Sequence, residues 1–229
     1  GPFYPVHMNR LKFILGWFLT CISFTACSQK ATLRIFDKPI TWNAEREQLS
    51  LNYLKERHGL VQTTATIKPQ MVVVHWTAIP TIEVTFDVFN PITLGGRADL
   101  TGASNLNVSS QFLIDRDGTI FRLLPETTFA RHVIGLNYLA IGIENIGSDD
   151  MPLTNAQLEA NEKLIRYLKR KYPIDYVIGH HEYQRFQKTE LWKETDPNYR
   201  TVKSDPGDAF MSQLRKKLTD INLKPLPTL

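Results

Sequence analysis

Cysteine is the scarcest reactive residue in this sequence. Its only two copies, Cys21 and Cys27, both fall within the first 27 of 229 residues. Beyond residue 27 the chain therefore has no cysteine for a disulfide and no thiolate for a metal ion. A domain of about 200 residues can bury enough apolar surface to fold without a disulfide, so this absence is compatible with an exported protein.

The chain also has no large excess of charge of one sign. The formal net charge is +4, but Arg10 and Lys12 lie in the first 27 residues, which contain no acidic residue. The rest of the chain has 25 basic and 23 acidic residues. Because no concentrated basic stripe stands out, we expect no nucleic-acid partner. Hydrophobic residues make up 42% of the chain and charged residues 22%, which is typical of a globular domain with a substantial core.

The apolar run at residues 13–24 is too short to cross a bilayer comfortably as a helix. It follows the basic stretch 8–12 and leads through small residues to a cysteine, which is the arrangement of a secretory leader. The ending Phe24-Thr25-Ala26-Cys27 resembles the lipobox of bacterial lipoproteins, where the leader is removed before a cysteine that then carries lipid.

We therefore predict a lipoprotein-type leader over residues 8–27, with a lipid anchor through Cys27. An ordinary secretory leader cleaved near Ala26 is the alternative. Residues 1–7 precede Met8, and we expect them to be a tag remnant or the result of a misplaced start codon. The lipid anchor predicts a periplasmic location on the outer membrane of a Gram-negative bacterium.

The remaining sequence predicts a tether and a first strand over residues 28–44, followed by a single domain over 45–229. Capping signals, apolar periodicity and β-branched runs predict its elements. Strands are expected at 33–36, 71–76, 110–115, 119–123, 138–144 and 176–178, and helices at 45–58, 155–172 and 206–218. The stretch 78–107 is loop-like, and so long a connection is usually functional. We expect an α/β or α+β fold with a central mixed sheet flanked by helices.

Two histidines close predicted strands. His75 is the next-to-last residue of the run 71–76, and His180 follows the strand at 176–178. A single strand-end histidine is more often structural than a ligand. Two of them, followed by the helix start Lys203-Ser204-Asp205-Pro206-Gly207, favour a metal site, because imidazole and carboxylate are common zinc ligands.

Five blocks in this order carry a more specific signal. They are Val74-His75-Trp76-Thr77-Ala78, Phe112-Leu113-Ile114-Asp115-Arg116-Asp117-Gly118-Thr119-Ile120, Ala140-Ile141-Gly142-Ile143-Glu144, Ile178-Gly179-His180 and Lys203-Ser204-Asp205-Pro206-Gly207. Together the blocks resemble the zinc-dependent N-acetylmuramoyl-L-alanine amidases, a family that includes phage amidase lysozymes and animal peptidoglycan recognition proteins. The resemblance covers roughly residues 70–218. It implies a single amidase/peptidoglycan-recognition-like domain that hydrolyses the amide between N-acetylmuramic acid and L-alanine in peptidoglycan or muropeptides.

The same resemblance implies that His75 and His180 are zinc ligands. The third ligand in the family is cysteine or aspartate, and this chain has no cysteine beyond residue 27, so Asp205 is the expected third ligand. A second Asp-Pro pair at Asp196 is the alternative. Glu144 is the expected general base, and Lys203 is expected to stabilise the oxyanion.

Four residues are expected at the substrate: His132, Trp76, Asn105 and Arg131. Trp192 and Tyr199, in the stretch between the ligand candidates, either cover the groove or form a local cluster. If the last strand continued, His181 would point away from His180. A non-catalytic peptidoglycan-binding module is the alternative function. A zinc peptidase is disfavoured because no His-Glu-x-x-His pattern is present. We expect a monomer.

Overall fold

Six short strands form one mixed sheet in the computed structural model, which describes residues 1–3 and 32–228. The whole predicted leader, residues 8–27 with both cysteines, lies outside the described residues. The strands belong to the unit Leu33–Leu229. In chain order they are β1 (Ile35–Asp37), β2 (Met71–Trp76), β3 (Phe112–Ile114), β4 (Ile120–Arg122), β5 (Ala140–Asn145) and β6 (Tyr176–Gly179).

The order of strands across the sheet is β1-β4-β3-β5-β2-β6. Strands β3, β5, β2 and β6 run parallel to one another, whereas β4 is antiparallel to β3 and parallel to β1. The β3–β4 pair is the predicted hairpin. Gly118 in its turn has a φ of 87°, a value that glycine adopts without steric cost. The sheet confirms the predicted mixed α/β class.

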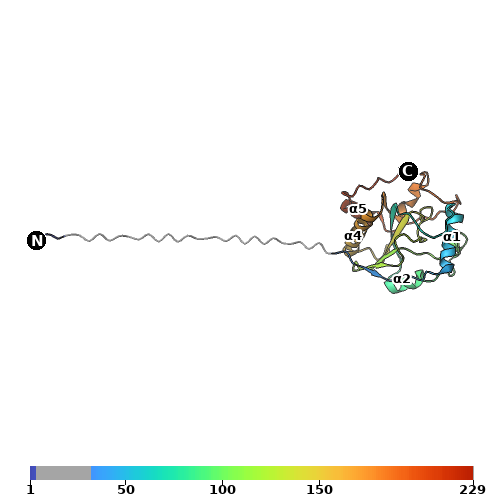
Figure 1. Cartoon of the computed structure of the whole chain (residues 1–229), viewed down its shortest axis with the longest axis horizontal. Helices are drawn as coiled ribbons and strands as arrows, with labels where there is room; N and C mark the ends of the chain where they lie inside the picture. The colour runs from blue at the N-terminus through green and yellow to red at the C-terminus, as the bar shows by residue number, and fades with distance from the viewer. Residues whose placement is uncertain (4–31, 229) are drawn as a thin grey trace. The chain divides into compact units, whose positions relative to one another are not determined.

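Helices flank the sheet on both sides. They are α1 (Ala44–His58), α2 (Ile82–Phe89), α3 (Ala98–Thr101), α4 (Asn155–Lys171), the 3-10 helix η1 (His180–Phe186) and α5 (Asp208–Lys217). Figure 1 shows α4 and α5 on one side of the strands and α1 on the other. Within the described residues, none of these helices is long and apolar enough to cross a membrane.

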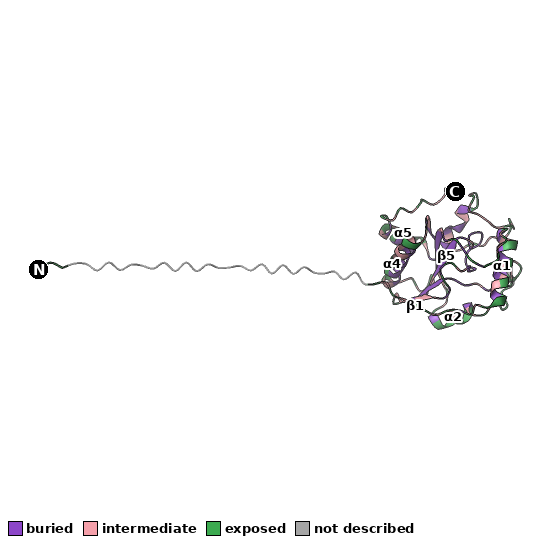
Figure 2. Ribbon diagram, viewed as in Figure 1, coloured by how far each residue is buried: buried purple, intermediate pink, exposed green. Residues whose placement is uncertain are grey.

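The central strands are buried on both faces, which explains their unbroken apolar sequence. On one face, Val72 and Val74 of β2 belong to the core that includes Leu164 and Leu168 of α4. On the other face, Met71 and Val73 pack with the segment 133–139 and with η1. Figure 2 shows the central strand β5 as buried, with exposed residues on the helices. Alternate residues of one strand therefore serve two different cores.

Local signals set several helix ends as the sequence predicts. Asn43 accepts a hydrogen bond from the backbone N–H of Arg46 at the start of α1, and Gly59 ends that helix in the left-handed region. At α4, Thr154 and Gln157 form the predicted capping box, with each side chain bonded to the other residue's backbone N–H. These ends confirm the two helix starts and one helix stop read from the sequence.

Two expectations were wrong, and the condition attached to a third is not met. The stretch 78–107 is not only loop, because it holds α2 and α3; α2 is capped by Thr81 and buries Ile82, Thr85 and Phe89 on one face. The last helix begins at Asp208 rather than residue 206, and its N-cap position is Gly207, so Asp205 does not cap it. Strand β6 ends at Gly179, so strand alternation does not govern the direction of His181.

Candidate metal centre and active site

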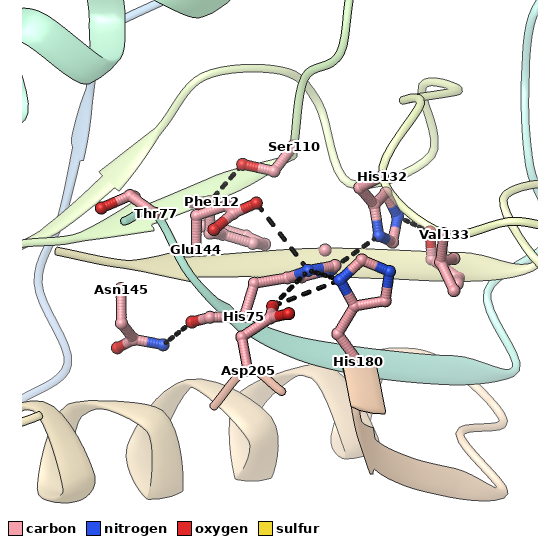
Figure 3. A network of polar contacts seen from close by, with 12 residues as sticks. His75, Thr77, Ser110, Phe112, His132, Val133, Glu144, Asn145, His180 and Asp205 are labelled. Atoms are coloured by element: carbon pink, nitrogen blue, oxygen red, sulfur yellow. Dashed lines mark hydrogen bonds and ion pairs between the residues drawn. The ribbon is translucent and has the colours of Figure 1, made fainter. Parts of the chain in front are cut away.

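Three neighbouring strands end at one edge of the sheet and direct side chains to one point (Figure 3). His75 on β2 pairs in register with Glu144 on β5, so both side chains leave the same face. Strand β6 pairs with β2 through Gly179 and Val74, which puts His180, the first residue of η1, beside His75. Asp205, from the loop before α5, completes the group.

The three candidate ligand atoms form a nearly equilateral triangle. His75 Nδ1 lies 3.0 Å from His180 Nδ1, and Asp205 Oδ2 lies 3.2 Å from each of these nitrogens. A tetrahedral zinc ion with bonds of about 2.0–2.1 Å holds its ligand atoms about 3.3 Å apart. All three residues are buried. Two imidazoles and one carboxylate in this geometry fit a catalytic zinc ion, which keeps one position open.

The electrostatics of the three groups also suit a metal ion. Burial lowers the pKa of His180 to about 4, so its imidazole is neutral. Burial alone would raise the pKa of Asp205, but hydrogen bonds and charge from His180 and His75 hold it well below its usual range. Burial lowers the pKa of His75 as well, yet the carboxylates of Glu144 and Asp205 outweigh burial and raise it. A metal ion would therefore compete with a proton for His75.

His132 determines which nitrogen of His75 faces the ligand triangle. His132 Nε2 lies 3.1 Å from the carbonyl oxygen of Ala140 and must donate to it. His132 Nδ1 is then an acceptor, and it lies 3.0 Å from His75 Nε2, which must donate. With the proton fixed on Nε2, the Nδ1 lone pair of neutral His75 is free for a metal ion.

Two residues that sequence reasoning missed hold His132 in place. Asn137 Oδ1 accepts hydrogen bonds from the backbone N–H groups of His132 and Val133. Gly142 on β5 leaves room for the imidazole, because a Cβ atom there would lie 2.9 Å from Cγ of His132. The glycine of the Ile-Gly-Ile-Glu block was a visible signal, whereas nothing local marks Asn137.

Glu144 lies beside the ligand triangle. Its Oε1 lies 3.8 Å from His75 Nδ1, and its Oε2 is buried without a hydrogen-bond partner among the described residues. Burial, reinforced by the charge of Asp205, raises the pKa of Glu144 to about 7, although His75 and Lys203 oppose the shift. A carboxyl group with a pKa near neutrality can both accept and return a proton, as a general base requires.

A cavity of about 310 Å³ opens over this group. Lys203 lines the cavity, and its charge lowers the pKa of Glu144, His75 and His180. Of the four residues expected at the substrate, Trp76, His132 and Arg131 line the cavity and Asn105 does not. Tyr199 and Thr201 form part of its wall.

Arg131 lines the cavity but its guanidinium is already engaged. It donates to the carbonyl oxygens of Leu100, Ser104 and Leu106 and to the hydroxyl of Tyr199. The side chain is buried, with 3% of the residue exposed. Arg131 therefore ties the segment around α3 to the stretch that contains Tyr199. Its predicted substrate contact stays a prediction.

The stretch 187–202 contacts α1 through an ion pair and a backbone hydrogen bond. Arg57 pairs with Glu194 at 2.6 Å, and the backbone N–H of Thr195 donates to the carbonyl of Arg57. Trp192 stacks on Tyr183 with ring centroids 5.9 Å apart, so it joins a local cluster rather than the cavity lining. Asp196, the alternative ligand, instead accepts a hydrogen bond from the backbone N–H of Asn198. The fold brings Asp205 to the two histidines, and Asp196 is not part of that group.

Comparison with known proteins agrees with this geometry. The family described as N-acetylmuramoyl-L-alanine amidase matches residues 64–208, well over half of the chain and a range that includes every candidate ligand and base. The chain belongs to this amidase family. Two Salmonella typhimurium proteins, both called 1,6-anhydro-N-acetylmuramyl-L-alanine amidase AmpD, are 28% identical to this amidase over 158 residues, which is 62% of this chain and 76% of theirs.

One solved structure shows the same fold. The amidase LysC from Clostridium intestinale superimposes with a TM-score of 0.51 at 20% identity, covering 84% of this amidase and 100% of LysC. Human PGRP-IBETAC, solved in complex with glycosamyl muramyl pentapeptide, gives a TM-score of 0.47 at 18% identity over 70% of this chain and 89% of its own. At these identities the likeness to LysC describes the fold alone.

Proposed function

We propose that this amidase hydrolyses the amide bond between N-acetylmuramic acid and L-alanine in a zinc-dependent reaction. The observation that carries the proposal is the buried triangle of His75 Nδ1, His180 Nδ1 and Asp205 Oδ2, with edges of 3.0–3.2 Å. Beside it lies a carboxylate oxygen of Glu144 that has no hydrogen-bond partner in the part of the chain that the structure describes. Family membership supports this choice of bond, and the triangle supports a metal ion at this position. Zinc there would make water nucleophilic near neutral pH and polarise the scissile carbonyl.

The residues around the triangle supply the proton transfers and the charge. Glu144 Oε2 takes the proton of the attacking water, and the same carboxyl group returns it to the leaving amine. The ammonium of Lys203, in the cavity wall, stabilises the negative charge that develops on the carbonyl oxygen. His132 keeps His75 in the required tautomer throughout.

The test is the identity of the product. The purified protein would be incubated with intact sacculi and with soluble muropeptides, including 1,6-anhydro forms because of the names of the Salmonella relatives. Mass spectrometry should find stem peptides that begin with a free L-alanine amino group. Cleavage inside the stem peptide, or tight binding without any product, would contradict the proposal and favour a peptidase or a non-catalytic binding module.

We also propose that the protein is exported and held by lipid on the periplasmic side of the outer membrane. The support is the order of basic stretch, apolar run and Cys27 in the sequence. In a bacterial host, the chain should incorporate labelled fatty acid and sediment with membranes. Cys27→Ser should abolish both properties, and a soluble, unlabelled parent chain would contradict the anchor.

A further inference from the structure

His181 makes two contacts with the same carbonyl group of a candidate metal ligand. Its backbone N–H donates to the carbonyl oxygen of Asp205 at 3.0 Å. Its ring nitrogen Nδ1 lies 3.1 Å from that oxygen, which accepts a hydrogen bond when Nδ1 carries the proton. The ligand's backbone is thereby held from the residue that follows His180, so His180 and Asp205 are linked by more than their side chains.

Gly179 permits this placement of the ring. A Cβ atom at Gly179 would lie 2.6 Å from both Cε1 and Nδ1 of His181, which no real side chain tolerates. The turn from β6 into η1 therefore folds the His181 ring back over the strand end. Any residue larger than glycine at 179 would push the ring away from Asp205.

The other ring nitrogen reaches the far end of the same loop. His181 Nε2 lies 2.7 Å from Oδ1 of Asp208, the first residue of α5. One imidazole thus bridges both ends of the four-residue segment from Asp205 to Asp208. The ring is largely enclosed, with 15% of its side chain exposed.

We propose that His181 is a positioning residue that directs the Asp205 carboxylate toward His75 and His180 by fixing the Asp205 carbonyl. The inference rests on the proposed zinc-dependent function. A carboxylate on an unrestrained loop would spend part of its time out of the triangle, so metal affinity would fall. Groups that orient metal ligands typically contribute about 10–100-fold to metal affinity.

Two substitutions separate the two ring contacts. The amide nitrogen of asparagine can take the place of Nδ1, so His181→Asn keeps a donor for the Asp205 carbonyl and loses the contact with Asp208. The amide of the longer glutamine can take the place of Nε2, so His181→Gln keeps the contact with Asp208 and loses the donor. Exposed Gln187, at the end of η1, gives the control variant Gln187→Ala.

The experiment is a zinc titration in competition with a chromophoric chelator, together with the visible spectrum of the cobalt-substituted protein and the melting temperature of each variant. We expect His181→Gln to weaken zinc binding about 10–100-fold and to alter the cobalt spectrum. His181→Asn and Gln187→Ala should resemble the parent protein in both measurements.

The outcomes separate the two proposals. Equal zinc affinity in His181→Gln and the parent would overturn the positioning role while leaving the proposed function intact. Equal losses in His181→Asn and His181→Gln would also overturn it, because the donor to Asp205 would then not matter. A parent protein that hydrolyses its substrate without binding zinc would overturn both the zinc dependence and the positioning role.

Discussion

The consecutive histidines His180 and His181 join two different groups of side chains. His180 belongs to the triangle with His75 and Asp205, whereas His181 lies with Glu182 and Asp208. Both groups hold histidine and carboxylate atoms within metal-binding distance of one another. They differ in what else those atoms contact. The triangle is buried, whereas the side chain of Asp208 is 95% exposed.

In the second group the ligand atoms are already used. Glu182 accepts from the backbone N–H of Gly179 and from the guanidinium of Arg215. Both ring nitrogens of His181 are engaged by Asp205 and Asp208. In the triangle, by contrast, the candidate atoms mainly face one another. Buried polar atoms in that arrangement are costly unless a proton or a metal ion lies between them. What distinguishes a metal site from a structural network is therefore the presence of free lone pairs, and not the number of histidine and carboxylate residues.

The largest expected effect is the loss of the metal. His180→Ala removes one of three protein ligands and should lower zinc content from about one ion per chain to nearly none. The matched variant Asp208→Asn alters the second group and should keep about one ion per chain. Elemental analysis of the purified proteins measures both. Zinc retained in His180→Ala, or lost only in Asp208→Asn, would reverse the assignment of the two groups.

Glu144→Gln should separate chemistry from metal binding. The amide cannot take a proton from water, so turnover should fall about 10²–10⁴-fold. Zinc content should stay at the parental level because Glu144 is not one of the three candidate ligands. Turnover is measured by the release of stem peptide from muropeptides, and an unchanged rate would remove Glu144 from the mechanism.

The pH dependence of turnover follows from the same residue. Burial raises the pKa of Glu144 to about 7, and a base works only when it is deprotonated. Turnover should therefore increase with pH and level off above that pKa, with a slope of about tenfold per pH unit on the acid side. A bound cation would lower this pKa, so the midpoint should lie at or below about 7. A rate that falls as the pH rises through this range would contradict the assignment.

His132→Ala should have an intermediate effect. The substitution leaves Nε2 of His75 without its acceptor, so the tautomer of His75 is no longer fixed. Zinc affinity should fall about 10–100-fold, which is the usual contribution of a group that orients a ligand. A chelator competition titration measures the change. If affinity is unchanged while turnover falls, His132 acts on the substrate, as the sequence first suggested, rather than on His75.

The sequence predicted the site residues that a local pattern marks, and it did not predict contacts between residues far apart in the chain. His75, Glu144 and His180 were predictable because each closes an apolar strand, and parallel strands end at the same edge of a sheet. The role of His132 was not, because its partners are His75 and a carbonyl on β5. Local patterns cannot show contacts that only the assembled sheet creates.

The choice between the two Asp-Pro sites was open to sequence, because only Asp205 lies in a Lys203-Ser204-Asp205-Pro206-Gly207 block. The fold brings Asp205, and not Asp196, to the two histidines. Helix α2 was missed for a different reason. Its capping threonine and apolar face were present in the sequence, but Pro80 and Pro91 on either side favoured a loop reading.

The smallest expected effect tests whether the second group is structural. Glu182→Gln keeps an acceptor for Gly179 but loses the charge paired with Arg215, whose Nη1 lies 2.9 Å from Oε1 of Glu182. Glu182 is largely buried and Arg215 is 36% exposed, so the unfolding free energy should fall by about 1–3 kcal/mol, at the lower end because solvent screens the arginine.

Asp175→Asn, which breaks the more exposed pair with Lys224, should cost at most about 1 kcal/mol. Denaturant unfolding measures both, and zinc content should be unchanged in each. Loss of zinc in Glu182→Gln without loss of stability would mean that the second group binds the metal after all, because a structural ion pair affects the metal only by way of the fold.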